Sequence, residues 1–212
     1  MGFPTLIIDN FFDDPDKVVE YANTLEFSSA ELGEWPGKRS DEMWMINPEL
    51  FLYVCNKIYK TFYPDGVEQG FIKMKFQYIE PYEFDNEGWI HQDNTQFGGI
   101  IYLTKESEMG TGTSLYKPVR GYFDYPVEAG KNKCNYYLGK EFDKDEYKKT
   151  KKELNDSFQE TLRVESIYNR LFMFGGNVWH GVPSFGTKPR LTMVFFSQGI
   201  LDKAPEPLLR GA

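Results

Sequence analysis

From residue 71 onward the sequence consists of short β-type segments separated by turn-forming residues. The segments are rich in Phe, Ile, Val, Tyr and Thr, and Gly, Pro, Asn or Asp stands at nearly every junction. About eight segments can be distinguished, at residues 71–80, 88–94, 97–104, 112–117, 161–166, 169–176, 178–182 and 190–199. This number of short strands predicts a β-sandwich or barrel.

The last of these segments, residues 190–196 (RLTMVFF), is largely apolar on both of its faces. A strand of this kind must be covered on both sides. Helices are predicted over residues 15–27 and from residue 48 onward, because Asp14 and Asn47 can each cap a helix that begins with proline. We expect these helices to cover one side of the strand.

The chain as a whole is therefore predicted to be mainly β with flanking helices, an α+β protein whose N-terminal helices pack on the larger sheet. Its 212 residues are expected to form a single domain, 1–212. Residues 1–70 would give helical support and residues 71–198 the β core. Two short strands are expected in the N-terminal part, in TLIIDN at residues 5–10 and in MWMI at residues 43–46.

A long insertion at about residues 118–158 interrupts the β segments and contains the charged stretch DKDEYKKTKKELNDSF. Mixed charge at this density indicates a solvated surface helix. The alternative is a lid over an active site, because long insertions in compact domains are often functional.

The composition excludes several classes of protein. A net charge of −8 and a pI near 4.9 would repel a phosphate backbone, so nucleic acid is not an expected partner. No apolar run is long enough to span a membrane, and the first residues lack the features of a signal peptide. Cys55 and Cys134 have no disulfide or metal-site spacing, which fits a reducing compartment. These features predict a soluble cytoplasmic protein.

The only two histidines of the chain stand in contexts that indicate a metal site. His91 precedes Asp93 by two residues, so on a strand their side chains would share one face. His180 can supply a third ligand, and two histidines with one carboxylate form the facial triad of non-haem Fe(II) oxygenases. The alternative is a pair of ordinary core histidines.

The sequence HQDN together with WHGVPSFGTKPRLT resembles the iron- and 2-oxoglutarate-dependent oxygenases, in particular their prolyl-hydroxylase-like branch. The resemblance covers residues 71–198. It implies a double-stranded β-helix, also called a jelly roll and cupin-like, with Fe(II) held by His91, Asp93 and His180. It further implies 2-oxoglutarate as cosubstrate, O2 as oxidant, and hydroxylation rather than halogenation, since halogenating relatives lack the carboxylate.

The same resemblance implies how the cosubstrate is held. Arg190 lies ten residues after His180, and its planar guanidinium suits a bidentate grip on the distal carboxylate of 2-oxoglutarate. Thr192 would share its face and add a hydrogen bond. Tyr102 and Tyr78 match tyrosines that reach the cosubstrate or the iron pocket, and Tyr82 is an alternative to Tyr78.

The substrate is expected to be a peptidyl side chain, with proline as one case, or a small amino-acid-like molecule. Trp35 offers an apolar surface, and Lys38 and Arg39 offer charges to a carboxylate in the segment GEWPGKRS. Arg120 is a further candidate for substrate binding. Three alternatives remain open: a non-catalytic module that binds metal or 2-oxoglutarate, a structural jelly roll, and a cupin-like iron enzyme that uses no 2-oxoglutarate.

Overall fold

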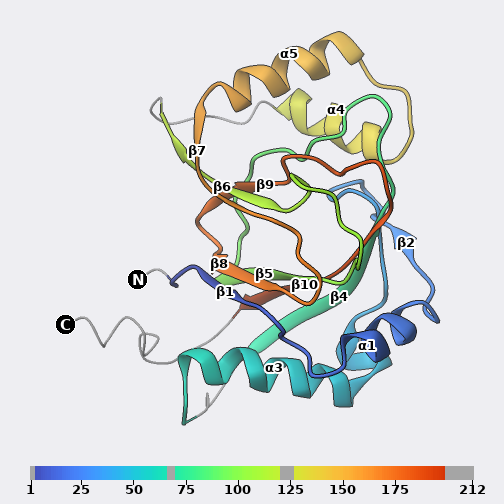
Figure 1. Cartoon of the computed structure of the whole chain (residues 1–212). Helices are drawn as coiled ribbons and strands as arrows, with labels where there is room; N and C mark the ends of the chain where they lie inside the picture. The colour runs from blue at the N-terminus through green and yellow to red at the C-terminus, as the bar shows by residue number, and fades with distance from the viewer. Residues whose placement is uncertain (1–2, 66–69, 120–126, 199–212) are drawn as a thin grey trace.

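Two antiparallel sheets face each other in the computed structural model, which describes residues 3–65, 70–119 and 127–198 (Figure 1). In spatial order the large sheet contains β1 (Leu6–Ile8), β8 (Leu171–Gly175), β5 (Phe97–Tyr102), β10 (Arg190–Gln198), β4 (Phe71–Ile79), β3 (Lys38–Arg39) and β2 (Ser28–Ser29). The small sheet contains β7 (Phe158–Val164), β6 (Thr113–Pro118) and β9 (Trp179–Gly181). The arrangement is the predicted double-stranded β-helix.

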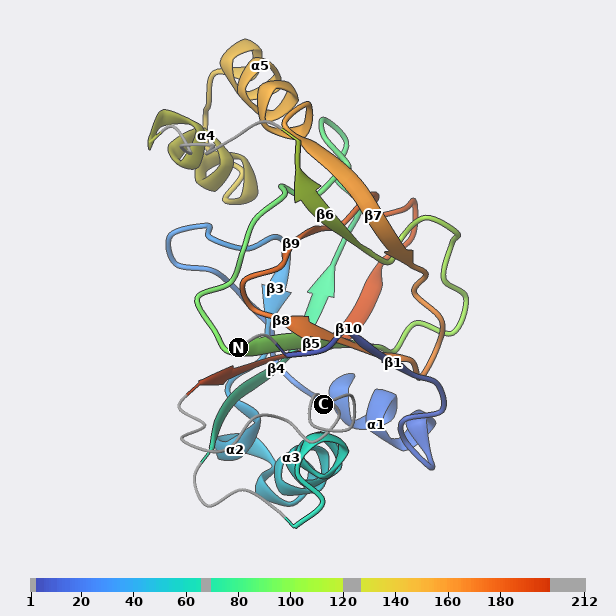
Figure 2. The same ribbon diagram turned by 90° about the vertical axis from the view of Figure 1, so that its left-hand side faces the viewer.

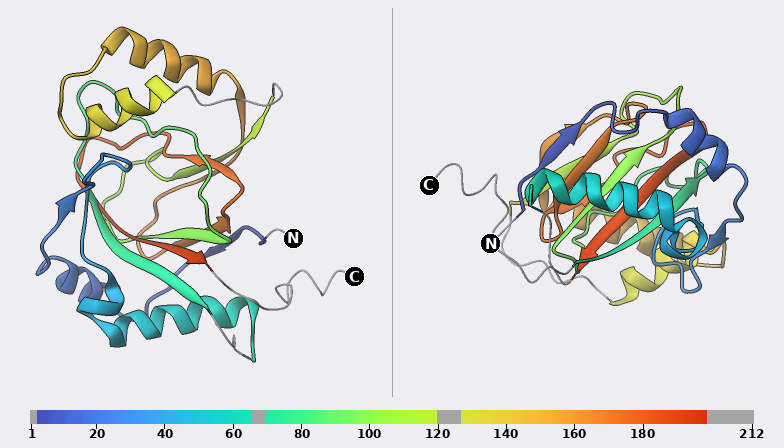
Figure 3. Two further views of the ribbon diagram at one scale, coloured as in Figure 1. Left: turned by 180° about the vertical axis from the view of Figure 1, so that it is seen from behind. Right: turned by 90° about the horizontal axis from the view of Figure 1, so that it is seen from below.

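Three N-terminal helices cover the outer face of the large sheet, and α3 runs across its strands (Figure 3). They are α1 (Pro15–Ala22), α2 (Met43–Ile46) and α3 (Pro48–Phe62). The predicted caps are present: the Asp14 carboxylate accepts a hydrogen bond from the Lys17 amide, and Asn47 Oδ1 accepts one from the Leu50 amide at 3.0 Å. In the first turn of each of these two helices, the cap pairs one backbone N–H that has no partner within the helix.

Strand β10 lies in the middle of the large sheet and is apolar on both faces, as predicted. Leu191, Met193 and Phe195 pack in the core shared with the helices, which also buries Val54, Ile58 and Phe62 of α3. Burying each such side chain contributes about 1.5–3 kcal/mol, an upper estimate because the unfolded chain is not fully extended. The other face of β10 points between the two sheets.

The insertion forms two helices on the far side of the small sheet from α3 (Figure 2). They are α4 (Val127–Tyr137) and α5 (Lys144–Asn155). Although the sequence of α5 is highly charged, one side of the helix faces the protein interior. On that side Tyr147 and Leu154 are fully buried in a cluster with Trp89 and Ile90. The insertion is therefore docked on the β core, while the opposite side of α5 is solvated as expected.

Three local predictions were wrong. Residues 43–46 form helix α2 instead of a strand, and α1 ends at Ala22 instead of continuing to about residue 27. Segment 88–94 is not a regular strand and contributes only an isolated antiparallel bridge between His91 and His180. Within the described residues no helix is long and apolar enough to cross a membrane.

Candidate metal and cosubstrate site

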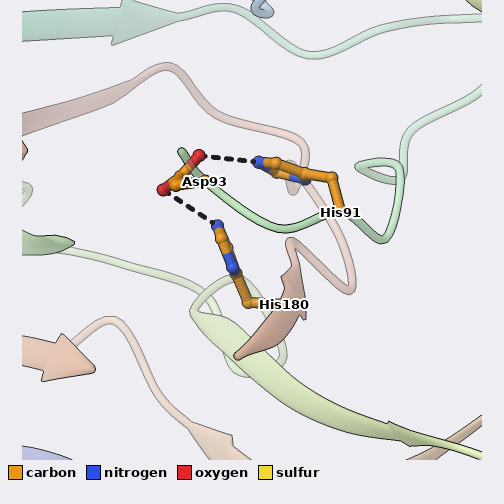
Figure 4. A group of neighbouring side chains, drawn as sticks. All are labelled: His91, Asp93 and His180. Carbon is orange, nitrogen blue, oxygen red and sulfur yellow. Dashed lines mark ion pairs between the residues drawn. The ribbon is translucent and has the colours of Figure 1, made fainter. Parts of the chain in front are cut away.

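His91, Asp93 and His180 converge on one point between the two sheets (Figure 4). His91 Nε2 lies 3.7 Å from Asp93 Oδ1, and His180 Nε2 lies 3.5 Å from Asp93 Oδ2. The three ligand atoms all lie within 4.8 Å of one another. Two atoms that each contact one ion at about 2.0–2.2 Å can stand up to roughly 4.2 Å apart, so both measured spacings fit a shared metal.

Hydrogen bonds fix the orientation of both imidazole rings. Nδ1 of His91 donates to the Trp89 carbonyl at 2.8 Å, and Nδ1 of His180 donates to the Val178 carbonyl at 2.9 Å. In a neutral imidazole the other nitrogen is then an acceptor with a free lone pair. Both Nε2 atoms face Asp93, so each ring presents its lone pair to the place where a metal would sit.

Burial also keeps the two rings in the neutral form that binds metals. It lowers the pKa of His180, although the nearby Asp93 carboxylate acts in the opposite direction. The His91 side chain is 45% exposed, and its pKa is lowered by desolvation within the site and further by the charge of a protonated His180. At neutral pH the site therefore offers two neutral nitrogens and one carboxylate on one side of an ion, which is the donor set of a facial triad.

Backbone contacts hold the irregular segment 88–94 in place although it is not part of a sheet. The amide of His91 donates to the His180 carbonyl and the amide of His180 to the His91 carbonyl, both at 2.9 Å. The amide of Asp93 donates to the Gly176 carbonyl at 3.0 Å. A Cβ atom on Gly176 would lie 2.1 Å from the Thr95 carbonyl oxygen, so glycine permits this close approach. All three ligands are thereby tied to one another through main-chain bonds.

Helix α5 of the insertion contacts segment 88–94 through a hydrogen bond. The Trp89 indole donates to the Tyr147 hydroxyl at 2.9 Å, and that hydroxyl donates to Asp85 Oδ2 at 2.6 Å. Lys151, which is 5% exposed, places its ammonium 2.6 Å from Asp85 Oδ1. Because the Trp89 carbonyl accepts the hydrogen bond from His91 Nδ1, this network links helix α5 to the orientation of a candidate metal ligand.

A cavity of about 300 Å³ opens beside the three ligands and contains Arg190 and Thr192 in its wall. Arg190 is 4% exposed, and among the described residues its guanidinium makes one hydrogen bond, from Nη1 to the Ser184 carbonyl at 3.3 Å. No acidic side chain among the described residues forms an ion pair with it. Burial lowers the pKa of Arg190. Its guanidinium nevertheless stays protonated, because arginine is not deprotonated in proteins. A buried cation of this kind is stabilised by an anionic ligand.

Neither of the two tyrosines proposed for the site is part of the cavity wall, although Tyr102 lies directly beside it. Tyr102 is buried between the sheets, and its hydroxyl donates at 2.9 Å to Thr113, which itself lines the cavity. Burial raises the pKa of Tyr102 to about 12, so it stays protonated. Tyr78 points to the helical face of the sheet, where its ring lies 6.1 Å from that of Phe27. Tyr82 packs against Phe185, and its hydroxyl accepts a hydrogen bond from the Gly37 amide at 2.7 Å. It lines a neighbouring recess, outside the cavity wall.

The alternation of strand β4 explains the position of Tyr78. Ile72, Met74 and Phe76 face the helices, so Tyr78 continues that series and Gln77 points into the cavity. Gln77 pairs with Thr192 on one side and with Arg39 on the other. The sequence therefore contained the signal for Gln77, in the apolar residues at alternate positions of residues 72–76.

Of the residues proposed for substrate binding, the structure brings Trp35 and Arg39 into the cavity wall and leaves Lys38 in the neighbouring recess. Arg120 lies outside the described residues. Lys133 of α4 also lines the cavity and was not foreseen. No local sequence signal identifies it, because its place depends on how the insertion folds back over the small sheet.

Comparisons with solved structures agree on the fold. HygX from Streptomyces hygroscopicus, solved with nickel, 2-oxoglutarate and hygromycin B bound, superposes with a TM-score of 0.57 at 12% identity, covering 94% of this chain and 84% of HygX. A prolyl hydroxylase from Trichoplax adhaerens, in complex with a hypoxia inducible factor peptide, gives 0.54 at 14% identity, covering 92% and 83%. The 2-oxoglutarate-dependent epimerase SnoN gives 0.53 at 10% identity, covering 92% and 77%. At such identities these matches establish the double-stranded β-helix alone.

Comparisons of sequence are less informative about activity. No curated protein matches the chain. One family model matches residues 1–183, a range that includes the three candidate metal ligands and ends before Arg190. The model describes a family of unknown function, DUF6445, and since it spans most of the chain, this protein is a member of that family.

Proposed function

We propose that the protein is an Fe(II)- and 2-oxoglutarate-dependent dioxygenase that hydroxylates an unactivated carbon of a peptidyl or amino-acid-like substrate. The observation that carries the proposal is the placement of a buried arginine, which has no acidic partner among the described residues, in the same cavity as a convergent His-Asp-His group. The metal donor set alone would suit several divalent ions. Arg190 adds a charged anchor for a second, anionic ligand beside the metal.

The chemistry that Fe(II) would supply is activation of O2, coupled to oxidation of 2-oxoglutarate to succinate and CO2 with one oxygen atom inserted into a substrate C–H bond. The residues of the chain bind and orient. His91, Asp93 and His180 would occupy one side of the ion and leave the other side to ligands. Arg190 would hold the distal carboxylate of 2-oxoglutarate through paired N–H donors.

Other cavity residues would position the cosubstrate and exclude water. Thr192 Oγ1 now donates a long hydrogen bond of 3.4 Å to the Gln77 carbonyl, so its hydroxyl is available for a better partner. Part of the remaining wall is apolar and includes Ile100, Phe174 and Val194. An apolar wall lowers the local dielectric and strengthens the interaction of Arg190 with an anion.

Relatives of the same fold support the ligand assignment and leave the reaction open. HygX was solved with nickel and 2-oxoglutarate, and also with iron. The Trichoplax enzyme is a prolyl hydroxylase with a peptide bound, which favours a peptide among the candidate substrates, whereas SnoN is an epimerase. Hydroxylation is proposed here because Asp93 completes the carboxylate position of the triad.

The test is calorimetric titration of 2-oxoglutarate into protein loaded with Zn(II), which holds the site without turnover. The Arg190→Met variant should bind at least 100-fold more weakly, because two hydrogen bonds to a charged group contribute about 1.5–3 kcal/mol each. Arg190→Lys keeps the charge and should lie between the two. Equal affinities in all three proteins would remove 2-oxoglutarate from the proposal, and absence of Zn(II) binding would remove the metal site.

A further inference from the structure

A second positively charged group lies in the cavity, separate from Arg190. It consists of Arg39 on strand β3 and Lys133 on helix α4, and both side chains line the cavity that contains the metal ligands. Burial lowers the pKa of both Arg39 and Lys133, and the negative charge of Asp93 partly offsets that lowering. Both cations border the same cavity as the candidate metal ligands, although they come from segments about ninety residues apart in the chain.

The Arg39 guanidinium is held in place by two aromatic rings and one hydrogen bond, and some of its N–H groups have no partner among the described residues. Its guanidinium carbon lies 4.4 Å from the centre of the Trp35 ring and 5.5 Å from that of Phe196. Nη2 donates to Gln77 Oε1 at 3.3 Å, whereas Nε is buried and has no hydrogen-bond partner in the part of the chain that the structure describes. The indole nitrogen of Trp35 is likewise buried and unpartnered. Nη1 and Nη2 are not among the buried unpartnered atoms, so they are the donors that Arg39 can offer to a ligand in the cavity.

Lys133 has no hydrogen bond or ion pair with any other residue in the described ranges. Glu34 also lines the cavity and is exposed, so it lies at the mouth. Neither Arg39 nor Lys133 reaches Glu34 within ion-pair distance among the described residues. Two cations thus face the cavity interior with one solvated carboxylate nearby.

The formal charges of the proposed complex leave these two cations unbalanced. An Fe(II) ion, Asp93, Arg190 and the two carboxylates of 2-oxoglutarate cancel one another. Among the described residues of the cavity wall, Arg39 and Lys133 then have only Glu34 as counter-charge, with Glu42 acting on Arg39 from outside the wall, in a protein whose net charge is −8. The positive character of this part of the cavity is therefore local and opposite in sign to the rest of the molecule.

The two cationic groups are also spatially distinct along the sheet. Gln77 pairs with Thr192 of β10 on one side and with Arg39 of β3 on the other. Adjacent strands are about 4.8 Å apart, so the main chains at Arg39 and Thr192 are roughly 10 Å apart, with Gln77 between them. The Arg39 side of the cavity can therefore bind a different ligand from the one that Arg190 would hold.

We propose that the primary substrate carries a carboxylate and that Arg39 and Lys133 bind it, with the Trp35 ring packing on the apolar part of the molecule. This inference rests on the proposed function and narrows its substrate to a carboxylic acid. The cavity is at the small end of the roughly 300–1,000 Å³ typical of ligand pockets. It must hold 2-oxoglutarate as well, so the acid is small or is the end of a longer chain.

The test compares acids with their neutral amides by saturation-transfer NMR on the full chain, loaded with Zn(II) and saturated with 2-oxoglutarate. The probes are phenylacetate, indole-3-acetate and 4-methylpentanoate, each paired with its primary amide. The acids should bind at least 10-fold more tightly than the amides. A capped dipeptide with a free C-terminal carboxylate, paired with its amide, shows whether a small acid or a chain end is preferred.

Variants locate the preference. Arg39→Met and Lys133→Met should each reduce the acid-to-amide ratio below about 3-fold, while Arg39→Lys and Lys133→Arg should retain part of it. Lys38→Met is the matched control, since it removes the same charge next to Arg39 but outside the cavity wall. Melting temperatures verify that each variant is folded.

Three results would overturn the inference. The acids could give no saturation-transfer signal, the amides could bind as tightly as the acids, or the preference for acids could persist in both Arg39→Met and Lys133→Met. A preference lost only in Arg190→Met would mean that the acids occupy the cosubstrate site, which would also overturn it. If Zn(II) or 2-oxoglutarate fails to bind, the proposed function fails first. The acid and amide comparison on metal-free Arg190→Met protein then still tests Arg39 and Lys133 by themselves.

Discussion

Replacing Lys151 by Met should destabilise the protein far more than its place in a highly charged segment suggests. The side chain of Lys151 is 7% exposed, and its ammonium lies 2.6 Å and 2.5 Å from the two oxygens of Asp85 and 3.1 Å from the Glu87 carbonyl. Asp85 is itself only 15% exposed. Met would fill much of the volume of Lys151 and would leave the carboxylate without its cation.

The expected cost follows from the burial of the pair. Removing one partner of a buried ion pair costs about 3–5 kcal/mol, because the other charge stays desolvated. Asp85 would retain the hydrogen bond from Tyr147 at 2.6 Å, so a value near 3 kcal/mol is expected. For a protein of this size that corresponds to a fall in melting temperature of roughly 6–12 °C.

Urea denaturation followed by circular dichroism measures the change in the free energy of unfolding. The control is Lys149→Met on the same helix, where the pair with Glu146 is 3.8 Å long and the lysine side chain is 65% exposed, so a loss below about 1 kcal/mol is expected. The double variant Asp85→Asn with Lys151→Met should lose less than Lys151→Met alone, because no buried charge remains. A loss below 1 kcal/mol in Lys151→Met would refute the view that α5 is anchored by this pair.

Three further predictions concern the metal site. Gly176→Ala should weaken Zn(II) binding at least 10-fold and lower the free energy of unfolding by about 1–3 kcal/mol. The reason is that the added Cβ would lie 2.1 Å from the Thr95 carbonyl oxygen and displace Asp93. An unchanged affinity for Zn(II) in calorimetry would contradict this. His180→Ala should abolish metal binding while the circular dichroism spectrum remains that of a folded protein, and a variant that still binds tightly would exclude His180 as a ligand. Since the folded-state pKa of His180 is below its unfolded value near 6.5, the metal-free protein should lose stability as pH falls below about 6.5, with up to about 1.4 kcal/mol per pH unit from this group. The His180→Gln variant should show a shallower slope in urea titrations between pH 6.5 and 5, and an identical slope would mean that His180 is not buried in the neutral form.

Much of the fold was predictable because local patterns and tertiary packing agree. Asp14 and Asn47 cap their helices as predicted, and the two-sided apolar pattern of residues 190–196 required a strand covered on both faces. The alternation of that strand also placed Arg190 and Thr192 on one face, where the structure brings both into the cavity wall. In these cases a period of two or 3.6 residues carries the information.

The errors occur where the pattern is too short or the contact too distant. Residues 43–46 are apolar and only four long, so periodicity cannot separate a helical turn from a strand. His91 and Asp93 converge with His180 through an isolated bridge and the contact with Gly176, which no strand pattern describes. Lys133 reaches the cavity from the insertion, and such long-range placement leaves no trace in the neighbouring sequence.

The most direct test of the central claim is an anaerobic titration of 2-oxoglutarate into Fe(II)-loaded protein, followed by visible absorption. We expect a charge-transfer band of the metal-bound keto acid that saturates with one equivalent of 2-oxoglutarate, and we expect it to be absent in His91→Ala and strongly weakened in Arg190→Met. Fe(II) binding without any band would contradict the assignment of 2-oxoglutarate as cosubstrate. If Fe(II) does not bind at all, His91, Asp93 and His180 are not a metal site and the proposed function is wrong.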